Sequence, residues 1–223
     1  MQYNSGRDFW WLLLRPWIAI PRLIQVLWTL GGLVIVLLLR GSSSNADVQR
    51  GLARRILNTL TGLGPCFIKL GQALSTRPDL VRRDWLEELT RLQDDLPAFQ
   101  HSIALARIEK ELGAPADQLF EEFPSAPIAA ASLGQVYKAR LEGQAWVAVK
   151  VQRPNLTFIL RRDLVLIRAL GVLTAPFLPL NLGFGLGSII DEFGRSLFEE
   201  IDYEQEADNA ERFASLFVDN PAV

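Results

Sequence analysis

The residue of this chain best suited to chemistry is Lys150. It lies near the end of an apolar run, Ala145–Gln152, which follows a first run, Val136–Leu141, across the turn Glu142–Gln144. Two short runs around a glycine-containing turn predict an antiparallel β-hairpin. A lysine at the end of a strand is a compact positive charge that suits phosphate oxygens. The sequence therefore predicts a phosphate-binding lysine at position 150.

Small residues directly precede this hairpin, in the order A-A-A-S-L-G. In nucleotide-binding hairpins a tight turn of small residues lies over the phosphates, and its usual pattern is G-x-G-x-x-G. Here alanines replace the glycines, and their methyl groups restrict the backbone. Taken alone, A-A-A-S fits the start of a helix or a packed small-residue turn as well as it fits a nucleotide-binding loop. The V-A-V-K string at Val147–Lys150 matches the protein-kinase strand that carries the phosphate lysine, which favours nucleotide binding. The predicted nucleotide-binding residues are Ala129, Ala130, Ala131, Ser132, Leu133, Gly134, Gln135, Ala148 and Lys150.

A second lysine, Lys69, belongs to the string K-L-G-Q in a predicted helix that begins near Pro65. Lys69 and Gln72 are three residues apart and therefore point to the same side of the helix. Gly71 between them leaves room for a close neighbour. On spacing alone, an ordinary amphipathic helix with an exposed lysine and glutamine is the favoured interpretation.

Acidic residues gather near the C-terminal end of the chain. From charge alone this cluster predicts a solvated helix face. In protein kinases, however, a helix glutamate pairs with the strand lysine and holds it toward the phosphates. Glu200 and Glu206 are both candidates for that role. The cluster consists of Glu199, Glu200, Asp202, Glu204 and Glu206.

Three motifs together, Ala129–Ser132, Val147–Lys150 and Lys69–Gln72, resemble the UbiB/AarF/ADCK family of atypical kinases. That family has an alanine-rich loop in place of the glycine-rich loop, and a K-x-G-Q motif in an extension before the kinase domain. The resemblance runs from about Gly64 to the C-terminus. Further matching segments are Ser75–Asp79, Leu92–Asp94, Glu200–Tyr203, Glu206–Ala207 and Asn209.

The resemblance implies roles for the charged residues. It assigns Glu206 to Lys150, and it assigns Glu200 with Asp202 to Lys69 or to the metal-binding side of the site, although Glu200 and Glu206 could be exchanged. The cofactor implied is ATP or ADP with Mg²⁺, and the partner implied is a membrane lipid or isoprenoid lipid. The family is linked to isoprenoid-quinone biosynthesis, of the ubiquinone or plastoquinone type, at a membrane. Lipid-linked or small-molecule ATPase chemistry is favoured over protein phosphorylation.

Parts of a complete kinase are missing from these 223 residues: there is no H-R-D-like catalytic loop and no D-F-G. The chain thus resembles an N-lobe with its extension. We expect the catalytic aspartate and the metal ligands in a C-terminal lobe, which would be its partner, and no turnover by this stretch alone. The alternative is a non-catalytic, membrane-associated module that binds a nucleotide or another partner.

Composition limits the other function classes. The net charge of −2 argues against general nucleic-acid binding. Residues 1–60 hold seven arginines and two aspartates, a basic balance that suits an anionic membrane surface. With one cysteine and one histidine, the chain can form neither an internal disulfide nor a His/Cys metal site. We expect Cys66 to be a buried filler and His101 to face solvent.

The most apolar segment, residues 23–39, predicts one helix of borderline length for crossing a membrane. Pro16 and Pro21 are expected to break the stretch before it. Tryptophans upstream resemble interfacial anchors, which favours membrane association. The flanking arginines give no orientation, and the location we expect is the cytoplasmic side. The alternative is a helix that packs on the rest of the domain or on a partner.

The whole pattern predicts an α+β fold: a partial protein-kinase-like N-lobe with a small antiparallel sheet, a mainly helical extension and an apolar N-terminal helix. The expected divisions are an apolar membrane-associated segment with its linker at 1–45, the helical extension at 46–123 and the partial N-lobe at 124–223. Helices are expected over 46–60, 84–93, 102–112, 117–123 and 155–174, with Ser102, Ser188 and Asp202 capping helices.

Overall fold

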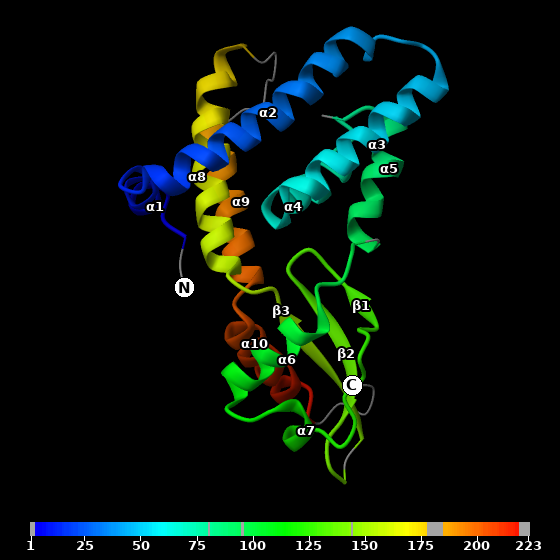
Figure 1. Cartoon of the computed structure of the whole chain (residues 1–223), viewed down its shortest axis with the longest axis vertical. Coiled ribbons are helices and arrows are strands. Elements are labelled where there is room, and N and C mark those ends of the chain that lie inside the picture. The colour runs from blue at the N-terminus through cyan, green and yellow to red at the C-terminus, as the bar shows by residue number, and fades with distance from the viewer. Residues whose placement is uncertain (1–2, 80, 95, 144, 178–184, 219–223) are drawn as a thin grey trace. The chain divides into compact units, whose positions relative to one another are not determined.

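A computed structural model describes residues 3–79, 81–94, 96–143, 145–177 and 185–218, without the side chains of Asp84, Gln93 and Asp94. The chain forms two units. One contains residues 1–19 and 161–223, and the other contains residues 20–160. Figure 1 labels their elements. The small antiparallel sheet, the predominance of helices and the single apolar N-terminal helix confirm the predicted α+β class.

The predicted hairpin is present in the second unit. Strands β2 (Gly134–Arg140) and β3 (Trp146–Gln152) pair antiparallel, with Val136 opposite Lys150 and Lys138 opposite Ala148. Gln144, in the expected turn, lies outside the described residues. A third strand that was not predicted, β1 (Ala129–Ala130), pairs antiparallel with the start of β2. The first two alanines of the small-residue stretch are thus part of the sheet.

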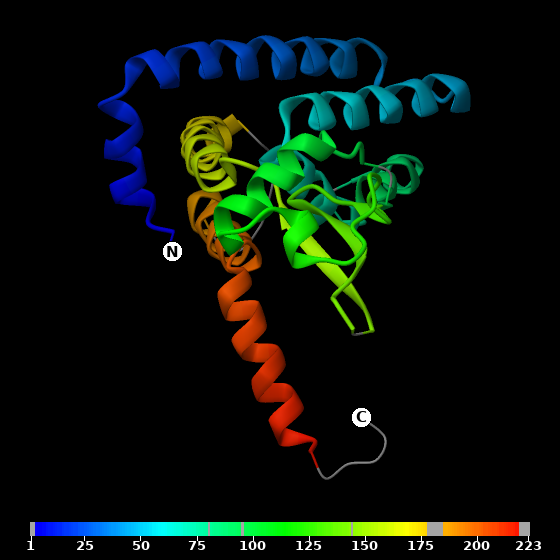
Figure 2. The same cartoon turned by 60° about the horizontal axis from the view of Figure 1, so that its bottom comes forward.

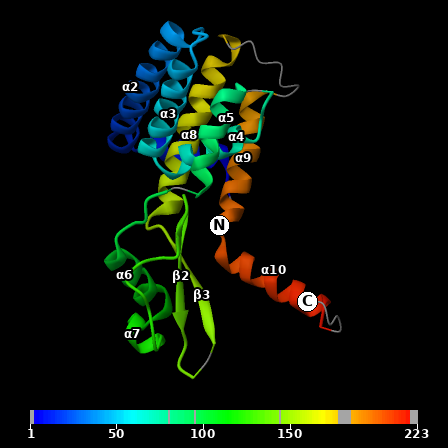
Figure 3. The same cartoon turned by 90° about the vertical axis from the view of Figure 1, so that its right-hand side faces the viewer.

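The two faces of this sheet differ because side chains alternate along a strand. Tyr137, Ala139 and Val151 are buried on one face, where they pack with residues of α6 (His101–Leu112) and α7 (Ala116–Leu119). Figure 3 shows these helices beside the hairpin. On the other face, Lys138, Ala148 and Lys150 are exposed. The hydrophobic core therefore fixes which face of the hairpin remains open.

Three helices form the rest of this unit's interior: α3 (Ala46–Leu63), α4 (Pro65–Ser75) and α5 (Arg83–Asp94). Their buried residues include Leu60, Leu89 and Leu92, and Cys66 is fully buried as expected. The helices approach closely at Gly71. A Cβ there would lie 2.5 Å from Leu92 Cδ1 and 2.7 Å from Leu60 Cδ1.

Replacing Gly71 by alanine is expected to destabilise the fold by about 1–3 kcal/mol, because the new methyl group overpacks the contact between α3, α4 and α5. Urea unfolding followed by circular dichroism measures this loss. Gly62→Ala is the matched control, since nothing lies within 4 Å of a Cβ at that helical position. Equal stability of the two variants would contradict the close approach.

Helix α2 (Pro16–Arg40) contains the whole predicted segment 23–39. The expected break at Pro21 is wrong, since this proline lies inside the helix. Pro16 occupies the first helical position, where proline's missing N–H costs nothing. From residue 20 onward α2 runs antiparallel beside α3 (Figure 2). By length and composition alone, α2 could cross a membrane.

The first unit is built from α8 (Leu156–Thr174, from Arg161 onward), the 3₁₀ turn Ala175–Phe177, α9 (Leu186–Glu200) and α10 (Tyr203–Leu216), together with α1 (Ser5–Leu13). Helices α8 and α9 pack closely, because a Cβ on Gly171 would lie 2.6 Å from Ile190 Cδ1. An ion pair of 2.8 Å between Arg168 Nε and Asp191 Oδ1 joins the same two helices.

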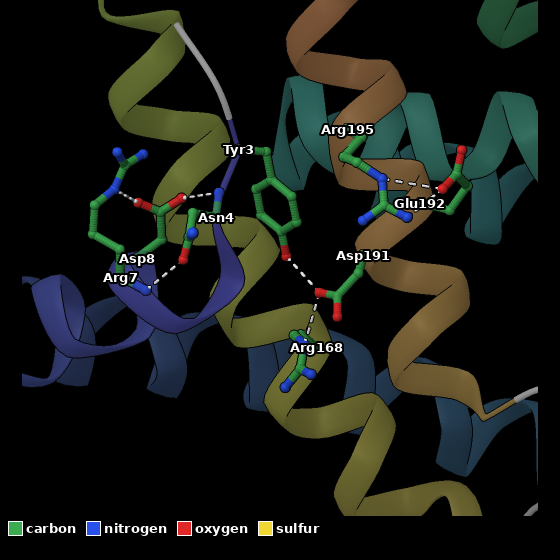
Figure 4. Close-up of polar contacts among 8 residues, drawn as sticks. All are labelled: Tyr3, Asn4, Arg7, Asp8, Arg168, Asp191, Glu192 and Arg195. Atoms are coloured by element: carbon green, nitrogen blue, oxygen red, sulfur yellow. Dashed lines mark hydrogen bonds and ion pairs between the residues drawn. The ribbon is translucent and has the colours of Figure 1, made fainter.

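The N-terminal arm, residues 3–14, belongs to this unit although 188 residues separate Tyr3 from its partner. The Tyr3 hydroxyl donates a 2.9 Å hydrogen bond to Asp191 Oδ1, which also accepts from Arg168 (Figure 4). The Tyr3 ring packs 5.8 Å from that of Phe198, and glycine at 194 makes room for it. Asp8 is fully buried and pairs with Arg161 at 3.1 Å.

One predicted helix cap is present, and two predicted caps and the predicted setting of His101 are not. Asp202 caps α10 as expected, accepting from the Gln205 N–H at 3.2 Å. The predicted caps at Ser102 and Ser188 are wrong, because α6 follows Gln100 and α9 follows Gly185, neither with a side-chain cap. His101 does not simply face solvent: its ring lies 5.9 Å from Phe123 and 5.8 Å from Tyr137.

Candidate functional site

Lys150 and Ala148 lie on the open face of the hairpin. They are two residues apart on β3, so they share a side of the strand, and both are exposed. The register places Val136 opposite Lys150, directly beyond the turn that follows β1. One face of the sheet therefore presents a lysine, a small residue and a neighbouring turn.

The turn between β1 and β2 is tight. The Ala131 N–H donates to the Gly134 carbonyl at 2.8 Å, which leaves Ser132 and Leu133 as the loop between the two strands. The Leu133 carbonyl accepts from the Arg153 N–H at 2.9 Å, and Ser132 and Leu133 are both buried. The alanine-rich stretch is thus a packed hairpin loop, and it is not the start of a helix.

Arg153, just after β3, stabilises this turn through side-chain hydrogen bonds. Its Nη2 donates to the carbonyls of Ala131 at 3.2 Å and Pro97 at 2.9 Å, and its guanidinium lies 5.3 Å from the Phe99 ring centroid. Burial lowers the pKa of Arg153. Arg153 was not among the predicted site residues. The one sequence feature that could have pointed to it is its position, since it is a positively charged residue between β3, the strand that carries Lys150, and Pro154.

Gln135 connects the same segment to the sheet. Its side-chain oxygen accepts from the Phe99 N–H at 3.0 Å, and its amide donates to the Tyr137 hydroxyl. Gln135 was predicted to bind the nucleotide, but its side chain is engaged in these contacts. Gln135 is the second residue of β2, opposite Ala130 and Val151, so it connects the loop to the sheet.

Two residues of the K-L-G-Q string support packing. Gln72 Nε2 donates to the Leu92 carbonyl near the end of α5 at 2.6 Å, and Gly71 permits the close approach described above. Lys69 lies on the same helix and is half-buried. Of this string, Lys69 is therefore the residue that could serve a ligand. Gln72 and Gly71 hold α4 against its neighbours.

The two candidate glutamates lie in the other unit. Glu200 ends α9 and Glu206 lies in the first turn of α10, with Tyr203 between them. Burial, followed by the negative charges of Glu206 and Glu200, raises the pKa of the Tyr203 hydroxyl to about 12. Both carboxylates thus act on one phenol. Their pairing with Lys150 and Lys69, which belong to the second unit, stays a prediction.

The ABC1 atypical kinase-like domain matches residues 91–223, more than half of the chain. The chain belongs to this family. The match begins within α5 and includes the whole hairpin with Lys150, as well as the glutamates of α9 and α10. The predicted resemblance is therefore confirmed.

Relatives extend the similarity to almost the full chain. An uncharacterised protein of Synechocystis sp. is 50% identical over 97% of this chain and 38% of its own length. The Arabidopsis thaliana protein named ACTIVITY OF BC1 COMPLEX KINASE 1, chloroplastic, is 44% identical over 92% of this chain and 30% of its own length. The Arabidopsis protein named ACTIVITY OF BC1 COMPLEX KINASE 3, chloroplastic, is 42% identical over 94% of this chain. The chain spans about a third of the length of such relatives.

A solved structure is also similar. Rv3197 from Mycobacterium tuberculosis, in its complex with erythromycin, matches 79% of this chain and 44% of its own, with 31% identity and a TM-score of 0.46. Kinase-like families generally use a nucleotide with Mg²⁺. In the described part of this family member, no three histidine, cysteine, aspartate or glutamate residues gather as a metal site would require.

The three tyrosines offer a test of the packing around the site. The pKa of each hydroxyl is raised. Burial is the largest cause for all three tyrosines, and nearby carboxylates raise the pKa values of Tyr3 and Tyr203 further. Absorbance at 295 nm should therefore show phenolate forming above pH 10 in the folded protein, whereas the unfolded chain titrates near its usual pKa of about 10.

Because these folded-state pKa values are raised, the corresponding stability is fully present below about pH 10 and is lost as the pH rises through the folded values. Tyr203→Phe should make the loss between about pH 10 and pH 12 shallower. Phenolate formation that follows the same curve in native and denaturing buffer would contradict this burial.

Proposed function

We propose that this chain is the N-terminal part of an ATP-dependent atypical kinase or ATPase that binds ATP or ADP. In this proposal the nucleotide lies on the open face of β2 and β3, below the β1–β2 turn. Lys150 contacts the phosphates, while Ala148 leaves space for the base. The loop Ala129–Gly134 supplies backbone N–H groups near the phosphates. Mg²⁺, carried with the nucleotide, would neutralise phosphate charge.

The observation that carries the proposal is that one face of the β2–β3 hairpin is buried and the other is exposed. The core formed with α6 and α7 covers the side bearing Tyr137 and Val151, so the side bearing Lys150 and Ala148 remains available to a ligand. Arg153 and Gln135 fix the loop beside it before any ligand binds. A pre-organised loop loses less conformational entropy on binding.

The wider role follows from the family resemblance. We propose Glu206 as the partner of Lys150, with Glu200 near Lys69, and a membrane location linked to isoprenoid-quinone biosynthesis. The names of the two Arabidopsis relatives associate those proteins with BC1 complex kinase activity. The apolar helix α2 supports a membrane location, for which we propose the cytoplasmic side. A non-catalytic nucleotide-binding module is the competing proposal.

Isothermal titration calorimetry with ATP and ADP, each with and without Mg²⁺, tests nucleotide binding directly. The expected result is saturable binding to the 223-residue chain. A longer chain that continues through a second lobe is expected to hydrolyse ATP in addition. Absence of binding in both chains would reject the nucleotide proposal, and binding without hydrolysis in the longer chain would favour the non-catalytic module.

A further inference from the structure

Helix α2 has an apolar outer face within the second unit. Its exposed large side chains lie within an arc of about 140° when successive residues are turned by 100°. Its buried residues from position 20 onward, Arg22, Val26 and Leu33, lie on the opposite side. A face of this size without polar residues marks an interaction surface. The exposed residues are Ile20, Ile24, Leu27, Trp28, Val34, Ile35, Leu38 and Leu39.

The inner face of α2 is held against the domain at both ends. Near its start, Arg22 donates to the Leu63 carbonyl at the end of α3 and lies 5.7 Å from the Phe67 ring centroid. Just after its end, the Gly41 carbonyl accepts from Gln49 of α3 at 3.1 Å and from Arg82 at 3.0 Å. Helix α2 is thus attached at its two ends to the domain that contains α3, and the two helices run side by side (Figure 2).

This attachment decides how α2 can meet a bilayer. Helix α3 exposes Arg50, Arg54, Arg55 and Asn58. If α2 crossed the hydrocarbon, α3 alongside it would be drawn in with these side chains, and charged groups are expensive there. If α2 lies in the plane of the interface, its apolar face enters the lipid while α3 stays among the headgroups and water.

A hollow of about 380 Å³ lies between the end of α2 and the start of α3. Val36, Val48 and Leu52 form apolar parts of its wall, and Arg40 and Arg55 supply two positive charges. Among the described residues, neither guanidinium has an ion pair or hydrogen bond. Asp47 also lines the hollow, and its carboxylate is paired with Arg50 at 2.7 Å. The hollow is therefore electropositive and partly apolar.

We propose that α2 lies flat in a membrane surface, with its outer face in the acyl region, and that the hollow between Arg40 and Arg55 takes the phosphate of an anionic lipid. Arginine suits this role because its planar fork can donate two hydrogen bonds to one phosphate. The apolar wall contacts the first carbons of the lipid. This proposal rests on the membrane location in the proposed function and is independent of nucleotide binding.

Vesicle co-sedimentation tests the lipid site with the full 223-residue chain. Vesicles of phosphatidylcholine alone are compared with vesicles that also contain phosphatidylglycerol. The expected result is tighter binding to the anionic vesicles, with Arg40→Gln and Arg55→Gln each losing about fivefold of that binding. Arg54→Gln is the matched control, because it removes the same charge from the same helix but Arg54 is paired with Glu88.

Inorganic phosphate distinguishes the source of the anion. Added at an ionic strength matched with chloride, it should not displace the protein from anionic vesicles. Displacement, or equal losses in Arg54→Gln and Arg55→Gln, would overturn the lipid site. Failure to bind either kind of vesicle would reject the membrane location itself, and this outcome is separate from the calorimetric test of nucleotide binding.

Single cysteines test the orientation of α2. Leu14→Cys and Ser44→Cys precede and follow the helix, and both positions are exposed, whereas the natural Cys66 is buried. A membrane-impermeant maleimide added outside sealed vesicles, after the protein has bound, should label both positions. Labelling at one end and protection of the other until detergent is added would show that α2 crosses the bilayer, and the in-plane arrangement would be wrong.

Discussion

Lys150→Ala is expected to weaken ATP binding by about ten- to hundredfold. Hydrogen bonds to charged groups contribute about 1.5–3 kcal/mol, and each 1.4 kcal/mol corresponds to a tenfold change in affinity. Lys150 is an exposed position on the open sheet face, so its truncation leaves the hydrophobic core intact. The measurement is calorimetric affinity for ATP with Mg²⁺, with thermal unfolding as a check that the fold is unchanged.

Lys138→Ala is the matched control for this change. Lys138 lies on the same face of the hairpin, opposite Ala148, and its ammonium stands 4.9 Å from the Trp146 ring centroid. Trp146 begins β3 at the end of the hairpin away from the β1–β2 turn, so Lys138 should contribute little to phosphate binding. Equal losses of affinity in the two variants would mean that the sheet face acts only through its general positive charge.

Charge reversal identifies the partner of Lys150. Lys150→Glu and Glu206→Lys should each weaken ATP binding, and their combination should recover part of it if the two residues form a pair. The same combination with Glu200→Lys serves as the comparison, since Glu200 and Glu206 both lie close enough to Tyr203 to raise its pKa. Recovery only with Glu200→Lys would exchange the proposed roles of the two glutamates.

Local sequence patterns predicted much of this fold. Two short strand-like runs around the turn containing Gly143 predicted the β2–β3 hairpin, and Asp202 correctly marked the start of α10. The motifs around Lys69 and Lys150 led to the family that the domain match confirms. These features depend on neighbours a few residues apart, which is the range over which periodicity and capping act.

Features that depend on distant contacts were missed. Pro21 lies inside α2, and its neighbour Arg22 donates to the Leu63 carbonyl, a tertiary contact that the local helix-breaker signal of proline does not predict. Arg153 holds the Pro97 carbonyl 56 residues earlier in the chain, and nothing in its local sequence predicts that contact. The same is true of Tyr3 and Asp191, whose hydrogen bond joins the N-terminal arm to α9.

Asp8→Ala is expected to destabilise the first unit by about 3 kcal/mol. Removing one member of a buried ion pair leaves the other charge without compensation, which typically costs about 3–5 kcal/mol. Arg161 keeps some solvent contact, so the lower end of that range applies. Asp8 also accepts from the Asn4 N–H at 3.3 Å and from Arg7 Nε at 3.4 Å, so its loss removes support from the start of α1.

Two measurements locate this effect. Urea unfolding gives the loss of stability, and limited chymotrypsin digestion should show faster cleavage at Trp10 and Trp11 of α1 as the N-terminal arm is released. Asp47→Ala is the control: Asp47 also lies in the first turn of a helix and pairs with an arginine, but its side chain is 86% exposed. Exposed pairs contribute about 0–1 kcal/mol, so this variant should resemble the wild type. If Asp8→Ala is as stable and as resistant to chymotrypsin as Asp47→Ala, the buried pair with Arg161 does not hold α1.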